Sequence, residues 1–403
     1  MEPTRKELIL AGAVFLALLL VVEAGLRITG VQFEPQLYQP SHERGWTLRP
    51  GATGVVATEN KQAIQINSLG FRDRERSYQK PDGTFRIAVL GNSWTEALQV
   101  PLEKTYPAVL ERELSSRACF GDGKRIEVLN FGVAGYSTAQ ELLTLRQEAG
   151  KYRPDLVLLA FYPARDVANN VRELNNAANP EQSPYFVAGE GALVEDDSFS
   201  ALPALQPREI ALQRLRYSVN DRVKFLQAIT ALQRLAKLRL ATAAVRQRAE
   251  QSGFDNLEYA IYAPPDLPAM QKGWLVTEGL IAQMRDEAKA DGAQFHVIVL
   301  ATRPQVLPDP AKKADLEGKL GVSDLTYADR RIRELGAKRN MPVTLLSPSL
   351  AGYAELHGVY LNGFNDRNWG AGHWNETGHR LAAEAIAADL CGSEPSAAKA
   401  GRE

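Results

Sequence analysis

The sequence has few of the residues that build metal and redox centres. Its 403 residues include two cysteines, Cys119 and Cys391, and five histidines. The cysteines lack metal-site spacing, and His373 and His379 fit neither a His-x-x-x-His helix face nor a cysteine-containing site. We therefore predict no metal and no other cofactor. If the two cysteines meet in an oxidising compartment, they could form one disulfide.

The chain also lacks a strong charge of either sign. Its formal net charge is −1, with 45% hydrophobic and 24% charged residues. This composition argues against intrinsic disorder and gives no electrostatic footprint for nucleic acid. A chain of this length is long enough for one large core or two modest ones.

A single long apolar run stands near the N-terminus. Arg5 and Lys6 precede the run from Leu8 to Val22, and Glu23 follows it. Positive charge before such a run predicts a cytoplasmic N-terminus and an exported remainder. We predict a retained signal-anchor within residues 1–30. A signal peptide cleaved near Ala24 and a buried helix are the alternatives.

Alternating strand and helix patterns follow from residue 85. The pattern predicts an α/β fold with a doubly wound, mainly parallel five-stranded sheet and helices on both faces. The apolar runs typical of buried parallel strands are 85–90, 126–130, 156–161, 295–300 and 343–346. The predicted helices between and after them are about 105–117, 138–150, 275–291, 326–339 and 378–390.

The remaining segments define the expected organisation. Residues 31–84 read as a lead-in that wraps the edge of an α/β domain at 85–392, and residues 393–403 as a flexible tail. A helical insertion spans about 172–250, beginning with an extended loop over 172–206. Its apolar positions at helical spacing include Phe225, Ile229 and Leu232, opposite a basic face, so it is either a solvated cover or a lid that touches anionic lipid. A second, short loop is expected over Pro304–Gly321.

The most informative segment follows the first predicted strand. Gly91-Asn92-Ser93 ends the run Phe85–Leu90, and a helix-compatible segment comes next. This order places the Ser93 hydroxyl at the carboxyl end of a buried strand, where open α/β sheets carry their chemistry. A serine there acts as a nucleophile only with a base and an oxyanion hole, and otherwise the turn is structural.

A base candidate stands near the other end of the chain. His373 lies just before the predicted C-terminal helix, and neighbouring groups can set the pKa of such a histidine near working pH. His379, at the start of that helix, reads as packing, and His296 reads as a core residue of its strand.

Together these blocks resemble the SGNH (GDSL-type) hydrolases. The resemblance covers roughly residues 85–170 and 275–390, with a lead-in, Ile66-Asn67-Ser68-Leu69-Gly70-Phe71-Arg72, that is often seen in bacterial members. It implies Ser93 as nucleophile and His373 as base. It also implies an oxyanion hole from the backbone N–H groups of Ser93 and Gly135. Relatives of this kind often begin with a membrane anchor, which implies a single-pass protein of the bacterial inner membrane with its catalytic domain in the periplasm or outside the cell.

Three positions depart from the family pattern. Asn92 replaces the family's Asp, Arg165 aligns with the oxyanion-hole Asn, and Gly370 aligns with the Asp that orients the base. Arg165 carries several donors and could replace the missing amide. Asp366, the nearest upstream acid, or a backbone carbonyl is the candidate that orients His373; the third possibility is that nothing does.

These residues predict an extracytoplasmic serine esterase with no cofactor. Its partners would be an ester-bearing small molecule, lipid or acylated saccharide, and the membrane through the N-terminal helix, but not nucleic acid. Trp94, Tyr136 and Tyr162 are candidates for the pocket wall or for ordinary packing. The alternatives are an acyltransferase or accessory in extracytoplasmic polysaccharide modification and a catalytically degenerate binding module.

Overall fold

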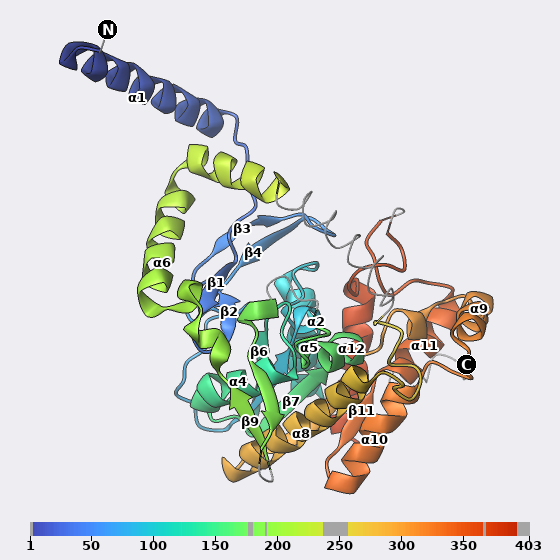
Figure 1. The fold of residues 1–403 in the computed structure, drawn as a ribbon. Coiled ribbons are helices and arrows are strands. Elements are labelled where there is room, and N and C mark those ends of the chain that lie inside the picture. The colour runs from blue at the N-terminus through green and yellow to red at the C-terminus, as the bar shows by residue number, and fades with distance from the viewer. Residues whose placement is uncertain are drawn as a thin grey trace.

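The computed structural model describes residues 3–121, 123–175, 180–189, 192–236, 257–365 and 368–392. It begins with α1 (Arg5–Ile28), which projects away from the body (Figure 1). Thr4 and Glu7 form a capping box that starts this helix. By length and composition α1 is long and apolar enough to cross a membrane, as predicted from the sequence.

A five-stranded parallel sheet forms the centre of the body. Its order is β11-β10-β7-β5-β6, and every neighbouring pair is parallel. The strands are β5 (Thr84–Gly91), β6 (Arg125–Gly132), β7 (Leu156–Phe161), β10 (Gln294–Val299) and β11 (Val343–Leu345). All residues of β5 and β7 are buried, as expected for central strands covered on both faces. The predicted fold class and all five predicted strands are confirmed.

Helices pack on the sheet in two groups. In one group α3 packs against α12 and β6, and in the other α4 and α5 pack against α8. These helices are α3 (Tyr106–Arg117), α4 (Thr138–Gln147), α5 (Pro163–Asn169), α8 (Pro268–Ala290) and α12 (Glu376–Leu390). Two more, α10 (Tyr327–Arg339) and α11 (Ser347–His357), contact β11 and α12 respectively. All five predicted helices are present, but α5 and α11 were not predicted.

The lead-in folds into two hairpins beside the sheet. They are β1 (Tyr38–Ser41) with β2 (Gly45–Leu48) and β3 (Thr53–Val56) with β4 (Gln62–Gln65). Apolar residues of both hairpins share a second, small core with Val133 and Tyr136, which follow β6. The lead-in therefore packs on the carboxyl end of the sheet rather than trailing from it.

Two sequence predictions about loops are wrong in part. The segment 310–320, expected as loop, is helix α9 (Pro310–Leu320), which Asp309 caps with two backbone N–H contacts. The segment 172–206 contains the hairpin β8 (Tyr185–Ala188) and β9 (Leu193–Asp196). The predicted helical part of the insertion is present as α6 (Pro207–Arg222) and helical residues 224–236, and residues 237–250 lie outside the described ranges.

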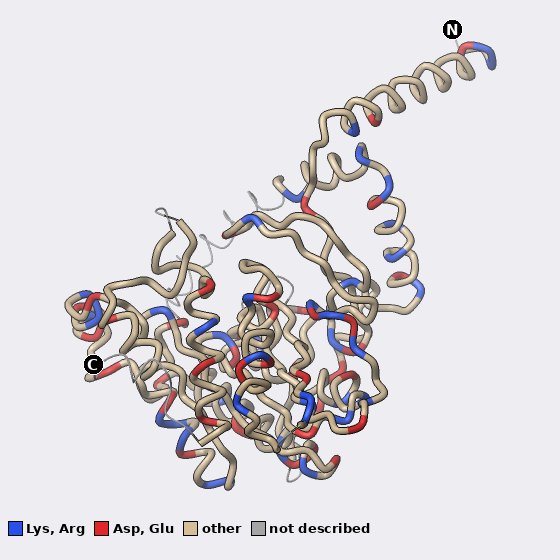
Figure 2. Tube along the Cα trace, turned by 180° about the vertical axis from the view of Figure 1, so that it is seen from behind, with Lys and Arg blue, Asp and Glu red and all other residues tan. Residues whose placement is uncertain are grey.

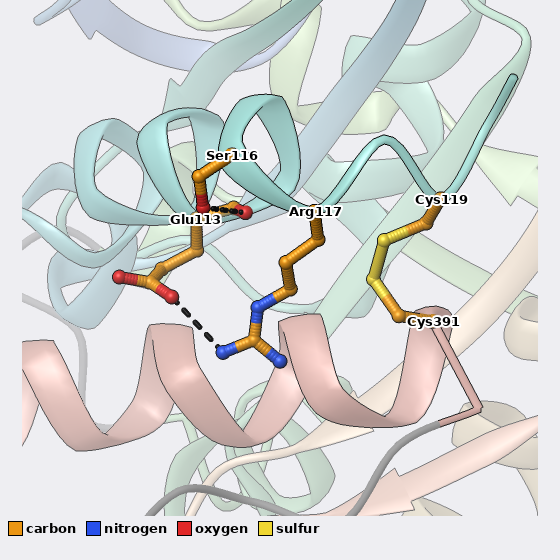
Figure 3. Close-up of a disulfide and its surroundings, with 5 residues drawn as sticks. All are labelled: Glu113, Ser116, Arg117, Cys119 and Cys391. Carbon is orange, nitrogen blue, oxygen red and sulfur yellow. Dashed lines mark hydrogen bonds and ion pairs between the residues drawn. A yellow bond between two sulfur atoms is a disulfide. The ribbon is translucent and has the colours of Figure 1, made fainter. Parts of the chain in front are cut away.

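The two cysteines are paired. Cys119 follows α3 and Cys391 ends α12, and their Cα atoms lie 5.2 Å apart (Figure 3). Glu113 and Arg117 form an ion pair of 3.0 Å one turn earlier on α3. The disulfide joins two helices that already pack side by side, and so it fixes the end of the helix that begins beside His373.

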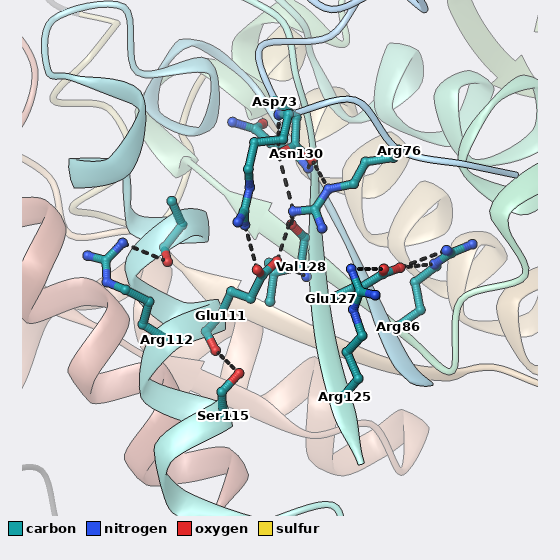
Figure 4. A network of polar contacts seen from close by, with 12 residues as sticks. Asp73, Arg76, Arg86, Glu111, Arg112, Ser115, Arg125, Glu127, Val128 and Asn130 are labelled. Carbon is teal, nitrogen blue, oxygen red and sulfur yellow. Dashed lines mark hydrogen bonds and ion pairs between the residues drawn. The ribbon is translucent and has the colours of Figure 1, made fainter. Parts of the chain in front are cut away.

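Buried ion pairs and hydrogen bonds join β5 to β6 and the lead-in to α3 and β6. Arg86 of β5 and Glu127 of β6 are 2.7 Å apart and almost fully buried. Nearby, Arg76 of the lead-in contacts both Asp73 and Glu111, and Glu111 accepts the backbone N–H of Val128 (Figure 4). This network holds residues 73–76 against the edge strand β6.

Candidate active site

Ser93 begins the short helix α2 (Ser93–Glu96) directly after β5. The Asn92 side chain caps this helix by accepting the backbone N–H of Trp94. β5 lies between β6 and β7 in the sheet. The chain continues from β5 to β6 at one edge of the sheet and from β7 to β10 toward the other edge. Ser93 therefore stands at the topological switch point, where doubly wound sheets bind ligands.

The lead-in motif supports the turn after Ser93. The Arg72 guanidinium is almost fully buried and donates to the carbonyl oxygens of Glu96, Ala97 and Val100. These carbonyls lie at and just beyond the C-terminus of α2, where a cation is favourable. Arg72 thus anchors the helix whose first residue is Ser93.

His373 reaches Ser93 from the loop before α12. Asn375 caps α12 by accepting the backbone N–H of Gly378. The His373 Nε2 atom lies 2.8 Å from Ser93 Oγ, within hydrogen-bonding distance. The structure therefore brings together the two residues that the sequence blocks pair.

Glu59 holds the other side of the imidazole, and the sequence analysis did not identify it. One carboxylate oxygen, Oε1, lies 2.7 Å from His373 Nδ1, and Oε2 accepts the His373 backbone N–H at 2.8 Å. This contact fixes the tautomer in which Nδ1 carries the proton and Nε2 accepts from Ser93. Burial raises the pKa of Glu59, but the hydrogen bonds and charge of His373 outweigh it and lower that pKa below its usual value.

Two glycines in the loop of His373 leave room for the side chains of Tyr360 and Glu59. Gly370 has φ of +81°, and a side chain there would meet the Tyr360 ring. A Cβ on Gly372, which has φ of +69°, would collide with the Glu59 carboxylate. The glycine-rich loop thus leaves space for an acid from the β3–β4 turn. Asp366, the predicted orienting acid, lies outside the described residues, and the described acid at Nδ1 is Glu59.

The loop after β6 presents Gly135 to the same place. Gly135 has φ of +83° and lines a cavity of about 450 Å³ together with Ser93 and His373. Both backbone polar groups of the preceding Ala134 are hydrogen-bonded. Its N–H donates to the Glu96 carboxylate, and its carbonyl oxygen accepts from Trp46 Nε1 at 2.9 Å. Because C=O and N–H point in opposite directions across a planar trans peptide, Trp46 fixes the direction of the Gly135 N–H.

Arg165 lies on α5 and lines the same cavity. Its side chain is exposed, and it lines the cavity with Asn169, one turn later on the same helix. The aromatic residues Trp94, Tyr136 and Tyr162 also line this cavity, as the sequence suggested. Arg165 is therefore placed to contact a ligand in the cavity.

Asn92, which departs from the family pattern, has a partner on α5. The Asn92 Nδ2 atom donates to Asp166 Oδ1 at 3.0 Å, and the other oxygen of Asp166 accepts the Tyr162 N–H at 2.7 Å. Burial raises the pKa of Asp166 to about 7. An aspartate at position 92 would set a second carboxyl against this buried one, whereas the amide supplies a donor.

His379 has a structural setting. It is fully buried in the first turn of α12, and its Nδ1 accepts the backbone N–H of Tyr106 at 3.3 Å. Burial lowers the pKa of His379 to about 3, so the ring is neutral at physiological pH. Within the described residues, no cluster of His, Cys, Asp or Glu has the arrangement of a metal site.

The fold and site together define an α/β protein with a Ser-His-Glu arrangement at its switch point. No family model matches the chain. A curated relative, an arylesterase of Vibrio mimicus, is 27% identical over 97 residues, which are 22% of this chain and 46% of that protein. The chain thus spans about half the length of the curated relative it matches.

The solved structures that resemble the chain are distant. An acetyl xylan esterase, AlAXEase, has 12% identity and a TM-score of 0.36, with 75% of this chain and 98% of that one covered. TesA has 12% identity and a TM-score of 0.36, with 76% of this chain and 99% of that one covered. A putative lipolytic protein of the G-D-S-L family from Desulfitobacterium hafniense has 12% identity and a TM-score of 0.33, with 75% of this chain and 97% of that one covered. Likenesses at this level say what the chain is similar to, and they assign neither a family nor a substrate.

Proposed function

We propose that the protein is a serine esterase that hydrolyses acyl esters on the outer side of a membrane. The observation that carries this proposal is the continuous hydrogen-bonded chain from Ser93 Oγ to His373 Nε2 at 2.8 Å and from His373 Nδ1 to Glu59 at 2.7 Å. A nucleophile, a base and a group that orients the base are the parts that such a reaction requires.

In the proposed reaction Ser93 Oγ attacks the ester carbonyl carbon while His373 Nε2 takes the hydroxyl proton. The backbone N–H groups of Ser93 and Gly135 stabilise the oxyanion, with Arg165 as a third donor. The alcohol leaves with the proton from His373, and an acyl-enzyme on Ser93 remains. Water, deprotonated by His373, then releases the acid and restores the serine.

The proposed location has two supports. Two basic residues, Arg5 and Lys6, precede the apolar stretch of α1, an order that directs the following domain out of the cytoplasm. The Cys119–Cys391 disulfide is of a kind that forms and persists in oxidising compartments such as the periplasm. We infer a single-pass anchor with residues 31–392 outside the cytoplasm.

A second candidate, acyl transfer to an alcohol, is favoured by one observation. Ser93 and His373 line two cavities, of about 490 and 450 Å³, so an acceptor has room to approach the acyl-enzyme from the side opposite the acyl group. The sequence-based alternative of a binding module without turnover has less support, because a binding site has no need of an oriented base against Ser93.

The test is turnover of aryl esters by the full chain in nanodiscs, with and without an added sugar acceptor. The proposal predicts release of the phenol and free acid, with turnover lost by at least about 10³-fold in Ser93→Ala and His373→Ala. Acylated sugar in place of free acid would favour the transferase. Equal, low rates in all three proteins would contradict both.

A further inference from the structure

One of the two cavities at Ser93 lies on the side of the membrane helix. Its volume is about 490 Å³, within the range of small-molecule sites. Its walls come from three elements: residues 34–38 just after α1, the β3–β4 hairpin, and the helical segment 224–236, which we call the roof segment. Ser93, His373 and Glu59 line its inner end, so it leads directly to the proposed nucleophile.

The lining of this cavity combines apolar side chains with polar and charged ones such as Glu34, Glu96 and Arg234. Pro35, Leu37, Val56 and Leu98 all line the cavity, and Leu37 and Val56 belong to the buried core of the lead-in. The cavity on the other side of Ser93 is lined by Arg165, Arg303 and Glu258 together with the aromatic residues Trp94, Tyr136 and Tyr162. The two halves of an ester bound at Ser93 would therefore meet different environments.

The roof segment is attached to the end of α1. The Glu23 carboxylate accepts the backbone N–H groups of Lys224 at 3.1 Å and Phe225 at 2.8 Å, and so caps the start of the roof segment. Arg27 pairs with Glu23 at 2.7 Å and donates to the Arg222 carbonyl at 2.7 Å. The Glu23 carboxylate, which would be unfavourable within an apolar span, therefore attaches the roof segment to the C-terminal part of α1.

Further contacts close the cavity around this attachment. Glu34 pairs with Arg234 of the roof segment at 2.7 Å and accepts the Ala57 N–H of the hairpin at 3.1 Å. Arg49 contacts Asp221, just before the roof segment. Figures 1 and 2 show the roof segment between α1 and the body, and residues of this segment line the cavity, so the cavity lies at the end of the molecule that faces α1.

We propose that this cavity binds the acyl chain of a long-chain ester that enters from the bilayer, so that the substrate is a membrane-resident amphiphile. The inference rests on the proposed esterase function and adds the substrate class to it. The hydrocarbon lies against Pro35, Leu37, Val56 and Leu98, where each buried methylene adds to binding. The polar part of the ester occupies the cavity lined by Arg165 and Arg303.

The test compares p-nitrophenyl decanoate with p-nitrophenyl acetate, using the full chain in phosphatidylcholine nanodiscs. We expect kcat/KM for the decanoate to exceed that for the acetate by at least about tenfold. The decanoate rate should follow its mole fraction in the bilayer and not its bulk concentration.

Two variants place bulk in the cavity, and one serves as a matched control. Leu98→Trp acts from the inner wall and Gln233→Trp from the exposed roof segment, where folding tolerates a large side chain. Each should lower the decanoate-to-acetate ratio by at least about tenfold. Leu232→Trp changes the neighbouring residue of the same helix, which does not line the cavity, and should keep the ratio.

The outcomes separate the inference from the function on which it rests. Turnover of acetate with a wild-type ratio near one, or a ratio that neither cavity variant lowers, overturns the acyl-chain site and leaves the esterase intact. A rate that follows bulk concentration overturns entry from the bilayer. Failure to turn over either ester removes the esterase proposal and the inference with it.

Discussion

Glu59 contacts His373 at two points, through the ring Nδ1 at 2.7 Å and through the backbone N–H at 2.8 Å. The residues are 314 positions apart in the sequence. One carboxylate thereby fixes both the position of the loop that carries the imidazole and the tautomer of the ring. The site is complete only when the lead-in packs on the α/β body.

Replacing Glu59 by Gln should lower kcat by about 10²–10⁴-fold, because the amide can stabilise the wrong imidazole tautomer and cannot stabilise the imidazolium. KM for a short aryl ester should change little. Asp82→Asn, an exposed acid of the same lead-in, is the matched control and should keep the wild-type rate. A Glu59→Gln enzyme within about threefold of wild type would show that His373 needs no orienting acid.

The pH dependence of stability follows from the same carboxylate. Since the folded pKa of Glu59 is lowered, its contribution to stability is present above its unfolded pKa and is lost as pH falls through the folded value. Acid unfolding of the wild type below about pH 4.5 should therefore be steeper than that of Glu59→Gln. Parallel unfolding curves over this range would contradict the lowered pKa.

Gly372→Ala should lose most activity because the methyl group collides with the Glu59 carboxylate. Gly358→Ala is the control, since Gly358 has φ of +62° and open space around the added methyl, so it carries the same backbone cost without the collision. Both variants should unfold about 1–2 kcal/mol more easily than wild type. Equal ester hydrolysis by the two variants would argue against a role for this contact.

Trp46→Phe removes the donor to the Ala134 carbonyl and frees the peptide that presents the Gly135 N–H. We expect kcat to fall by about 10–100-fold with an unchanged pH profile, because the base is untouched. Tyr78→Phe, an aromatic change in the lead-in away from both cavities, is the control. A changed pH profile without loss of rate would assign Trp46 another role.

Arg165→Ala tests whether the guanidinium is the third donor of the oxyanion hole, as we propose, and we expect a loss of turnover. If the guanidinium contacts the oxyanion, turnover falls at least about tenfold, and Arg165→Lys recovers part of it. If the hole consists of the backbone donors of Ser93 and Gly135, turnover of a short neutral ester stays near wild type. Steady-state kinetics on the acetate ester distinguish these outcomes.

Asn92→Asp should destabilise the fold by about 1–3 kcal/mol, because two carboxyls then meet in the buried contact with Asp166. The folded pKa of Asp166 is raised to about 7, so the contribution of this one carboxyl to stability is fully present below its unfolded pKa and is lost as pH rises through about 7. The variant should therefore lose more stability at pH 8 than at pH 5. Asn340→Asp on the exposed end of α10 should show no such difference in thermal unfolding.

The sequence predicted the sheet because its five strands are continuous apolar runs with turn residues at their ends, as Phe85–Leu90 before Gly91 illustrates. Ser93 and His373 were predictable because each stands beside a recognisable strand end or helix start. Glu59 was not, since it lies in a polar turn with no local signal and acts only through a contact across 314 positions. The glycines of the His373 loop were the available hint: a loop with no side chain at positions 370 and 372 leaves space for an acid from elsewhere.

The central claim is that Glu59 and His373 activate Ser93. It is tested most directly by reaction of the full chain with a fluorophosphonate, followed by mass spectrometry of the labelled peptide. We predict that the label lies on Ser93, that its rate falls by at least about 10²-fold in Glu59→Gln and in His373→Ala, and that none forms in Ser93→Ala. Labelling of a different serine, or equal labelling rates in all variants, would contradict the account.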